Sequence, residues 1–321
     1  MANAMDLSAL EQQIAAGFPL RDLCLTEGNY RGANLSGARF ERVHARGACF
    51  AGANLDHTHW KDCQLEGADF SHSTGQAFTM VACFLLGVRL CAAAWKKAYW
   101  QHCQGAGLDL TGATLQKWHL HDCHLPGLLL ADADLRKTLW SACVLEGLQG
   151  PCAQLSEVRM TDCRLAQSSF AAARLVQCAF DGSDLNGADF ERVHAASISL
   201  YQCVGAQLRF ADAVLEEAIF SQARFEQANF SRAMLNMAVL AQAHMPDANF
   251  AQAQLRYADC TAFSAPRASF VGADVTGLNA HAADFSHANW AQANLQDIQP
   301  PDTERLAAEQ WPNPPRQGVA P

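Results

Sequence analysis

The sequence predicts an all-β solenoid whose coil has four sides. The first observation is a period of five, because every fifth residue is large and apolar, as at Leu20, Leu25, Tyr30 and Leu35. The second is a small residue two positions before the large one, such as Ala33. The third is a period of 20, in which like residues recur at every fourth unit. Neither an α-helix nor an alternating strand repeats every five residues, so these periods indicate a repeat architecture.

The five-residue frame runs from Leu20 to Leu295 without insertion or deletion, which gives 56 units. Some units carry glycine or alanine at the large site, and the frame resumes after each of them. The columns with a period of 20 include cysteines at 63, 83, 103, 123, 143, 163 and 203, phenylalanines from 170 to 270, and glycines at 47, 67, 87, 107, 127, 147 and 187. Such columns are expected when four units complete one coil and successive coils stack.

Units such as Ala33-Asn34-Leu35-Ser36-Gly37 and Ala188-Asp189-Phe190-Glu191-Arg192 follow the pattern A-(D/N)-L-x-x. In this pattern the chain resembles the pentapeptide-repeat family over about residues 18–297. The resemblance implies a right-handed quadrilateral parallel β-helix, with the large and small repeat sites both pointing inward. The 56 units would make about 14 coils, and a coil spacing of roughly 4.8 Å gives a rod on the order of 65–70 Å long. Glycine at a fixed corner supplies a backbone angle that other residues adopt only with strain.

The chain is expected to divide into three parts, which are residues 1–17 as an N-terminal capping helix, residues 18–299 as the β-helix, and residues 300–321 as a C-terminal cap or partly disordered tail. Residues 6–16 read as a short amphipathic helix with Asp6 as its N-cap and with Leu7, Leu10 and Ile14 on one face. A stack of coils leaves an unpaired backbone edge at each end. This helix is therefore expected to cover the N-terminal edge.

The C-terminal end is less determined by the sequence. Two prolines, Pro300 and Pro301, follow the last repeat, a second short helix is expected over residues 302–311, and residues 312–321 have the composition of a disordered tail. The second helix would either cap the rod or serve as a contact in an end-to-end homodimer. The sequence does not decide between these two roles.

No catalytic site, cofactor site, metal site or small-molecule substrate is predicted. The chain has no Gly-rich phosphate loop, no HExxH and no GxSxG. The cysteine column lacks the paired short spacing of zinc motifs, and side chains stacked roughly 4.8 Å apart exceed the favoured Cβ separation of a disulfide. We therefore interpret these cysteines as small inward-facing apolar residues, and reduced thiols favour a cytoplasmic location.

Three histidines near one another, His119, His121 and His124, fall on different sides of a coil corner in the repeat frame. They are not expected to converge on one metal ion. His102 and Asp122 are 20 residues apart and are expected to form an outward hydrogen-bonded pair. No stretch approaches the roughly 20 uncharged apolar residues of a membrane span, so no membrane association is predicted.

A cluster of cations is the strongest candidate for a functional surface. Lys97, Lys117 and Lys137 fall at the same outward site on three successive coils, Lys96 and Arg136 adjoin two of them, and Tyr99, His119 and Arg159 follow round the corner. Like charges about 5 Å apart repel by roughly 1 kcal/mol in water, and a chain of net charge −9 has no folding reason to gather them. The cluster indicates a contact surface for an acidic partner or a nucleic-acid backbone. The alternative is a solvated face that Glu157 partly neutralises.

Two functions are compatible with these features. The first is a non-enzymatic protein-binding or scaffolding rod, in the range of roles that includes accessories or effectors of bacterial secretion systems. The alternative, which the family resemblance implies, is a DNA mimic that binds a type II topoisomerase such as DNA gyrase or topoisomerase IV. The acidic net charge favours a mimic, whereas the basic cluster opposes it.

Overall fold

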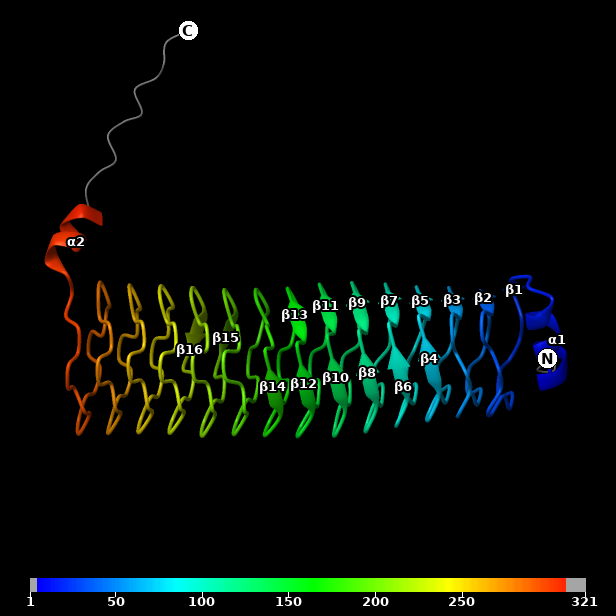
Figure 1. Cartoon of the computed structure of the whole chain (residues 1–321), viewed down its shortest axis with the longest axis horizontal. Coiled ribbons are helices and arrows are strands. Elements are labelled where there is room, and N and C mark those ends of the chain that lie inside the picture. Colours follow the sequence, from blue (N-terminus) through cyan, green and yellow to red (C-terminus); the bar gives the residue numbers. More distant parts are fainter. Residues whose placement is uncertain (1–4, 310–321) are drawn as a thin grey trace, which may run out of the picture.

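Each five-residue unit forms one side of a coil, because its large and small apolar sites face inward while the residues between them face solvent. In the unit around Leu35, Ala33 and Leu35 are buried and Asn34 is exposed. Four units close a coil, since Leu20 pairs with Phe40 in parallel and the same spacing continues to Asn279 and Gln299. The computed structural model describes residues 5–309 and confirms the predicted parallel β-helix (Figure 1).

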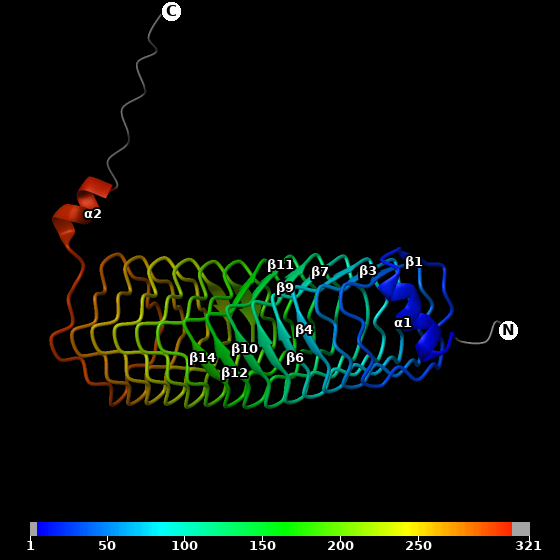
Figure 2. The same cartoon turned by 45° about the vertical axis from the view of Figure 1, so that its right-hand side comes forward.

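Short parallel strands mark two adjacent sides of the rod, and Figure 2 shows the coils stacked along a single axis. One side is an eight-stranded sheet made of β1 (Leu20–Arg21), β2 (Arg39–Glu41), β3 (His59–Lys61), β5 (Thr79–Val81), β7 (Tyr99–Gln101), β9 (His119–His121), β11 (Leu139–Ser141) and β13 (Arg159–Thr161). The next side is a six-stranded sheet made of β4 (Thr74–Gln76), β6 (Ala94–Lys96), β8 (Thr114–Gln116), β10 (Asp134–Arg136), β12 (Gln154–Ser156) and β14 (Arg174–Val176). A third sheet pairs β15 (Val204–Ala206) with β16 (Arg224–Glu226).

The corners of the coil are formed by residues with a left-handed backbone. The predicted glycine column is confirmed, with φ of 63° at Gly107 and 68° at Gly127. Non-glycine residues adopt the same conformation at many other corners, including Lys97 at φ 58° and Gln202 at φ 56°. Backbone bonds to the next coil hold these residues in place, and Lys97 N–H donates to the carbonyl of Gln116 at 2.8 Å. The ladder thus overrides the cost of about 1–2 kcal/mol of that conformation.

Units with glycine at the large site keep the core filled by enlarging a neighbouring inward side chain. A Cβ placed on Gly75 would lie 3.1 Å from Phe78, and one on Gly205 would lie 2.7 Å from Leu208. Phe78 and Leu208 occupy the site that is small in most units. Since cores tolerate swaps that conserve total volume, this exchange explains why the repeat frame continues through such units.

The helix α1 (Leu7–Ala15) covers the N-terminal end of the rod (Figures 1 and 2), as predicted. Its N-cap is Asp6, whose side chain accepts a hydrogen bond from Ala9 N–H, and Leu10 is fully buried against the first coils. The hydroxyl of Tyr30 donates to the carbonyl of Met5 at 2.6 Å. Burial raises the pKa of Tyr30 to about 12, which keeps this hydroxyl protonated as a donor.

The helix α2 (Thr303–Glu309) lies beyond the last coil, on one side of the rod axis (Figure 1). None of its side chains is buried, and its contact with the rod is through His281, whose Nε2 lies 3.2 Å from Glu309. The inward side chains of the last coil are correspondingly open, with Leu295 49% exposed. The remainder of the predicted second helix and the predicted tail at 312–321 lie outside the described residues.

Candidate partner-binding surface

The predicted cation cluster lies at the turn between the six-stranded and the eight-stranded sheet. Lys97 lies between β6 and β7, Lys117 between β8 and β9, and Lys137 between β10 and β11. We call the whole surface the basic corner and define it by Lys96, Lys97, Tyr99, Lys117, His119, Arg136, Lys137 and Arg159. These side chains are exposed or, at His119, half-buried.

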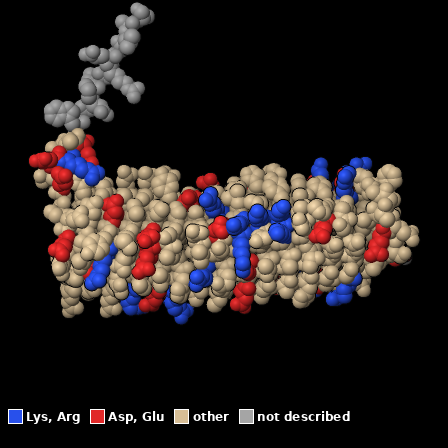
Figure 3. Space-filling view, viewed as in Figure 1, with Lys and Arg blue, Asp and Glu red and all other residues tan. Residues whose placement is uncertain are grey.

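The sequence places these cations in line because each coil repeats the geometry of the last. Lys97, Lys117 and Lys137 have nearly the same φ, at 58°, 56° and 54°, and stacked coils are roughly 4.8 Å apart. Figure 3 shows the resulting stripe of blue side chains over the strands β6 to β10, on a surface that is elsewhere mixed in charge. The structure therefore brings the predicted residues together on one edge of the rod.

Only part of the basic corner is neutralised. Arg136 turns back to its own strand, where Asp134 accepts hydrogen bonds at 2.8 and 2.5 Å and raises the pKa of the guanidinium. Lys137 Nζ lies 3.5 Å from Glu157, which confirms the neutralisation expected there. Lys96, Lys97, Lys117 and Arg159 form no ion pair with any residue between 5 and 309.

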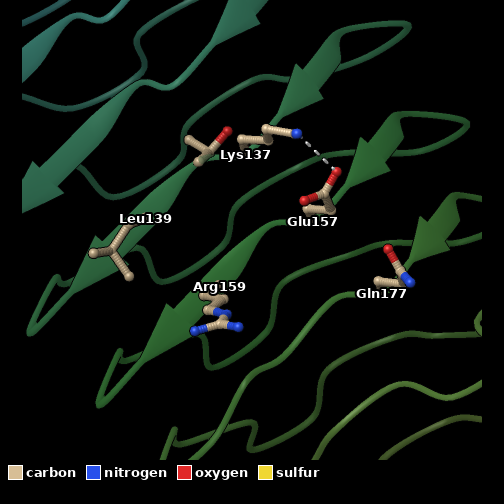
Figure 4. Close-up of a pocket in the computed structure, with 6 residues that line it drawn as sticks. Lys137, Leu139, Glu157, Arg159 and Gln177 are labelled. Carbon is tan, nitrogen blue, oxygen red and sulfur yellow. Dashed lines mark ion pairs between the residues drawn. The ribbon is translucent and has the colours of Figure 1, made fainter.

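A hollow adjoins the C-terminal end of the basic corner and has a volume of about 560 Å³. Figure 4 shows Lys137 and Glu157 facing one another across its upper part, with Leu139 and Arg159 on neighbouring strands and Gln177 on a further coil. Leu139 is 39% exposed. The hollow therefore combines the Arg159 guanidinium with the exposed aliphatic side chain of Leu139, while Lys137 is already paired with Glu157.

Sequence reasoning did not single out Leu139, Gln177 or Thr138, which also lines this hollow. Leu139 carried a usable signal, because it is a large apolar residue at an outward position of the repeat frame. Thr138 carried none, since its position is an ordinary inward site. The side chain of Tyr99, which was predicted, is 37% exposed beside Lys97 and adds a second partly apolar surface to the corner.

His102 and His121 bond to side chains of the next coil, and the cysteines of the column are buried. His102 Nδ1 lies 2.9 Å from Asp122, as predicted, and His121 Nδ1 lies 3.0 Å from the hydroxyl of Ser141. Within residues 5–309 no group of three His, Cys, Asp or Glu side chains is placed to hold a metal ion. The cysteine column is buried as free thiols. Burial raises the pKa of Cys203 to about 12, so that this thiol stays protonated at neutral pH.

Neither α1 nor α2, the two helices in the described part of the chain, has the length and apolar composition of a membrane-spanning helix.

Comparison with known proteins shows which repeat family the chain is similar to. The model for pentapeptide repeats matches eight copies, within residues 25–59, 48–74, 153–192, 209–240 and 238–262. Among solved structures, the chain is similar to HetL, a pentapeptide repeat protein involved in heterocyst differentiation regulation from the cyanobacterium Nostoc sp. strain PCC 7120. The identity is 18%, over 93% of this chain and 98% of that one, with a TM-score of 0.23.

It is also similar to full-length QnrB1, a plasmid-mediated fluoroquinolone resistance protein, with 12% identity over 74% of this chain and 97% of that one and a TM-score of 0.30. No curated protein matches the chain. The uninterrupted five-residue frame, the inward-facing large and small sites and the matching repeat model agree with one another. The chain therefore belongs to the pentapeptide-repeat family.

Proposed function

We propose that this protein is a non-enzymatic binding rod whose basic corner receives an acidic segment of a protein partner. The observation that carries the proposal is that Lys96, Lys97, Lys117 and Arg159 are exposed cations without a carboxylate among the described residues. Cations that the fold leaves unpaired can pair with a partner at no cost to existing contacts.

A protein partner is favoured over nucleic acid for two reasons. The chain as a whole has a net charge of −9 and would repel an extended polyanion. Asp134 and Glu157 adjoin the basic corner, and its own Tyr99 together with the neighbouring Leu139 offers apolar contact beside its charge. Such a mixture is typical of protein interfaces.

The test uses two variants of equal net charge. Replacing Lys97, Lys117 and Lys137 by Gln removes three charges from the corner, and the control replaces Gln202, Gln222 and Gln242 by Glu on the C-terminal coils. A fluorescent polyglutamate peptide and a DNA duplex serve as probes at fixed salt. We expect the corner variant to lose at least about tenfold in peptide affinity, or roughly 1.4 kcal/mol, while the control stays within about twofold of wild type. Equal loss in both variants, or preferential binding of the duplex, would contradict the proposal.

The same proposal includes the kind of system in which the partner is found. A scaffold of this kind suits an accessory of a bacterial secretion system, and the buried free thiols suit the reducing cytoplasm. Affinity capture from the source organism, with wild type and the corner variant side by side, would identify the partner. Recovery of DNA gyrase or topoisomerase IV by both proteins would instead favour the DNA-mimic alternative.

We further propose that the C-terminal end of the rod pairs with a second copy. The support is the open last coil, where Leu295 is 49% exposed and Phe285 and Trp290 are only partly buried. Among residues 5–309, α2 buries no side chain against these groups. Light scattering of wild type should show a dimer that Leu295→Asp converts to a monomer, and a monomeric wild type at micromolar concentration would contradict this proposal.

A further inference from the structure

An apolar hollow lies on another side of the rod, at the level of the basic corner but separate from it. Its volume is about 360 Å³, and it is lined by Glu66, Phe84, Leu86, Gln104, Gly105, Ala106, His124 and Pro126. Phe84 is 47% exposed and Leu86 is 58% exposed. Large apolar side chains that stay exposed next to one another on a folded rod mark an interaction site more often than isolated ones do.

The hollow is built into the backbone at Gly105. A Cβ at this position would lie 2.6 Å from the carbonyl carbon of Leu85, so that only glycine allows the coil to press against the coil before it. The next residue, Ala106, follows Leu86 and precedes Pro126 in one outward column, and its small side chain leaves a gap between these two larger ones. The depression therefore arises from a close backbone contact and a small side chain.

Glu66 stands at one end of the same column and is incompletely bonded. Its Oε1 lies 3.5 Å from Arg46, which is a long contact, and its Oε2 has no hydrogen-bond partner among the described residues. The Glu66 side chain is nevertheless 21% exposed. A carboxylate oxygen that is withdrawn from water without a donor is unfavourable, so Glu66 is the group of this hollow that a donor from a partner would satisfy.

We propose that this hollow binds a lysine or arginine side chain of a partner polypeptide. The backbone of the partner rests over Ala106, the aliphatic stem lies across Leu86, and the cation reaches Glu66. Two coils separate Ala106 from Glu66, which is roughly 9–10 Å along the axis and corresponds to an extended cationic side chain with its hydrogen bond. The ring of Phe84, which also lines the hollow, is available for a cation–π contact. The occupant thus matches both the apolar wall and the carboxylate.

Another hollow on this side of the rod, which lies over Gly205, provides an internal contrast. It has a volume of about 300 Å³, but Arg224 and Glu226 line it, so that a cation would meet an existing positive charge. The inference is therefore specific to the hollow over Gly105, and it does not depend on the proposed role of the basic corner.

The experiment compares small probes by NMR on methyl-labelled protein. N-acetyl-arginine methylamide and its uncharged counterpart N-acetyl-norleucine methylamide are titrated while the methyl signals of Leu86 and Ala106 are followed. We expect the arginine probe to bind in the millimolar range and at least about fivefold more tightly than the norleucine probe. Glu66→Gln should remove that preference, whereas Glu146→Gln, in the same column but paired with Arg164 at 2.5 Å, should leave it unchanged.

Ala106→Leu fills the gap without altering any charge and should abolish binding of both probes. Equal affinity for the two probes, with no effect of Glu66→Gln, would replace the cationic occupant by a purely apolar one and overturn the proposal. The absence of any shift at Leu86 and Ala106 in wild type would exclude the site itself. Since all three substitutions are at outward positions, the backbone ladder and the core are left intact.

Discussion

Two stretches of the rod fill the interior of their coils with different aromatic residues. The lysine coils, which we define as residues 94–161, are filled by tryptophans that meet edge to face, with ring centroids 5.1 Å apart for Trp100 and Trp118. The phenylalanine coils, residues 209–270, contain a continuous column of parallel rings, with interplanar angles of 2° for Phe210 and Phe230 and 4° for Phe230 and Phe250, beside edge-to-face pairs such as Phe220 and Phe230. A column that repeats one residue every coil allows regular stacking.

Buried polar atoms and surface ion pairs also differ between the lysine coils and the phenylalanine coils. In the lysine coils the indole Nε1 atoms of Trp100, Trp118 and Trp140 are buried, and no described residue accepts a hydrogen bond from them. The phenylalanine column brings no polar atom inside. Outside, Arg232 binds Asp212 at 2.7 Å and Arg267 binds Asp247 at 2.6 Å, whereas most cations of the basic corner lack a carboxylate.

The comparison shows that the repeat determines the backbone, whereas the particular residues of each coil determine its local stability and its surface charge. The lysine coils combine two unfavourable features, which are buried donors without acceptors and unpaired like charges. In the phenylalanine coils every buried side-chain donor of the described residues has a partner, and Arg232 and Arg267 are both paired. The part of the rod with the strongest candidate for partner binding is thus also the part whose local interactions are least satisfied.

The largest effect is expected in the aromatic columns. Phe230→Ala should lower the free energy of unfolding by about 3–5 kcal/mol, because it leaves a cavity between two parallel rings. Trp140→Phe should cost less than about 1.5 kcal/mol, because it keeps an aromatic ring and removes an unbonded donor. Urea unfolding measures both, with hydrogen exchange to identify which coils open. An equally large cost for Trp140→Phe would show that its indole N–H is bonded in solution.

A smaller effect is expected at a pair of inward threonines in one column. Thr138 Oγ1 is buried and lacks a partner within residues 5–309, whereas Thr58 Oγ1 donates to the carbonyl of Leu55 at 3.0 Å. Thr138→Val should therefore raise the free energy of unfolding by about 1 kcal/mol, while Thr58→Val should lower it by about the same amount. The two substitutions are chemically identical, so the same sign for both would refute the difference in bonding.

The fold could be predicted from the sequence because its determinants are local and repeated. A five-residue period names the inward sites, and a 20-residue period names the stacking partners, so that Lys97, Lys117 and Lys137 could be placed in line beforehand. The capping helix α1 could equally be predicted from Asp6 and the spacing of Leu7, Leu10 and Ile14.

What the sequence could not provide depends on side-chain rotation and on departures from the repeat. Arg136 adjoins Lys137 in sequence, yet it turns to Asp134 and leaves the row of free cations. The hollow over Gly105 arises because one glycine lets two coils approach closely, which a glycine in a degenerate unit does not reveal by itself. Long polar side chains have several partners within reach, and only the folded geometry selects among them.

The smallest effect on stability is expected for the exposed arginines. Their contribution should depend on salt and pH in the phenylalanine coils but not in the lysine coils. Arg232→Gln removes a paired cation and Arg159→Gln an unpaired one, so that only the former should lower the urea midpoint, and 1 M salt should reduce the difference. The guanidinium of Arg232 lowers the pKa of Asp212 below its usual 3.8. The stabilisation by this pair is therefore present above pH 3.8 and is lost as the pH falls below it.

As the pH falls below 3.8, wild type should thus lose stability that Arg232→Gln has already lost, so that the midpoints of these two proteins converge. Arg159→Gln should keep the acid response of wild type, because this arginine holds no carboxylate among the described residues. If the urea midpoint of Arg159→Gln converged with that of wild type instead, Arg159 would pair with a carboxylate in solution. The basic corner would then be partly neutralised by its own chain, and its remaining free charge would rest on Lys96, Lys97 and Lys117.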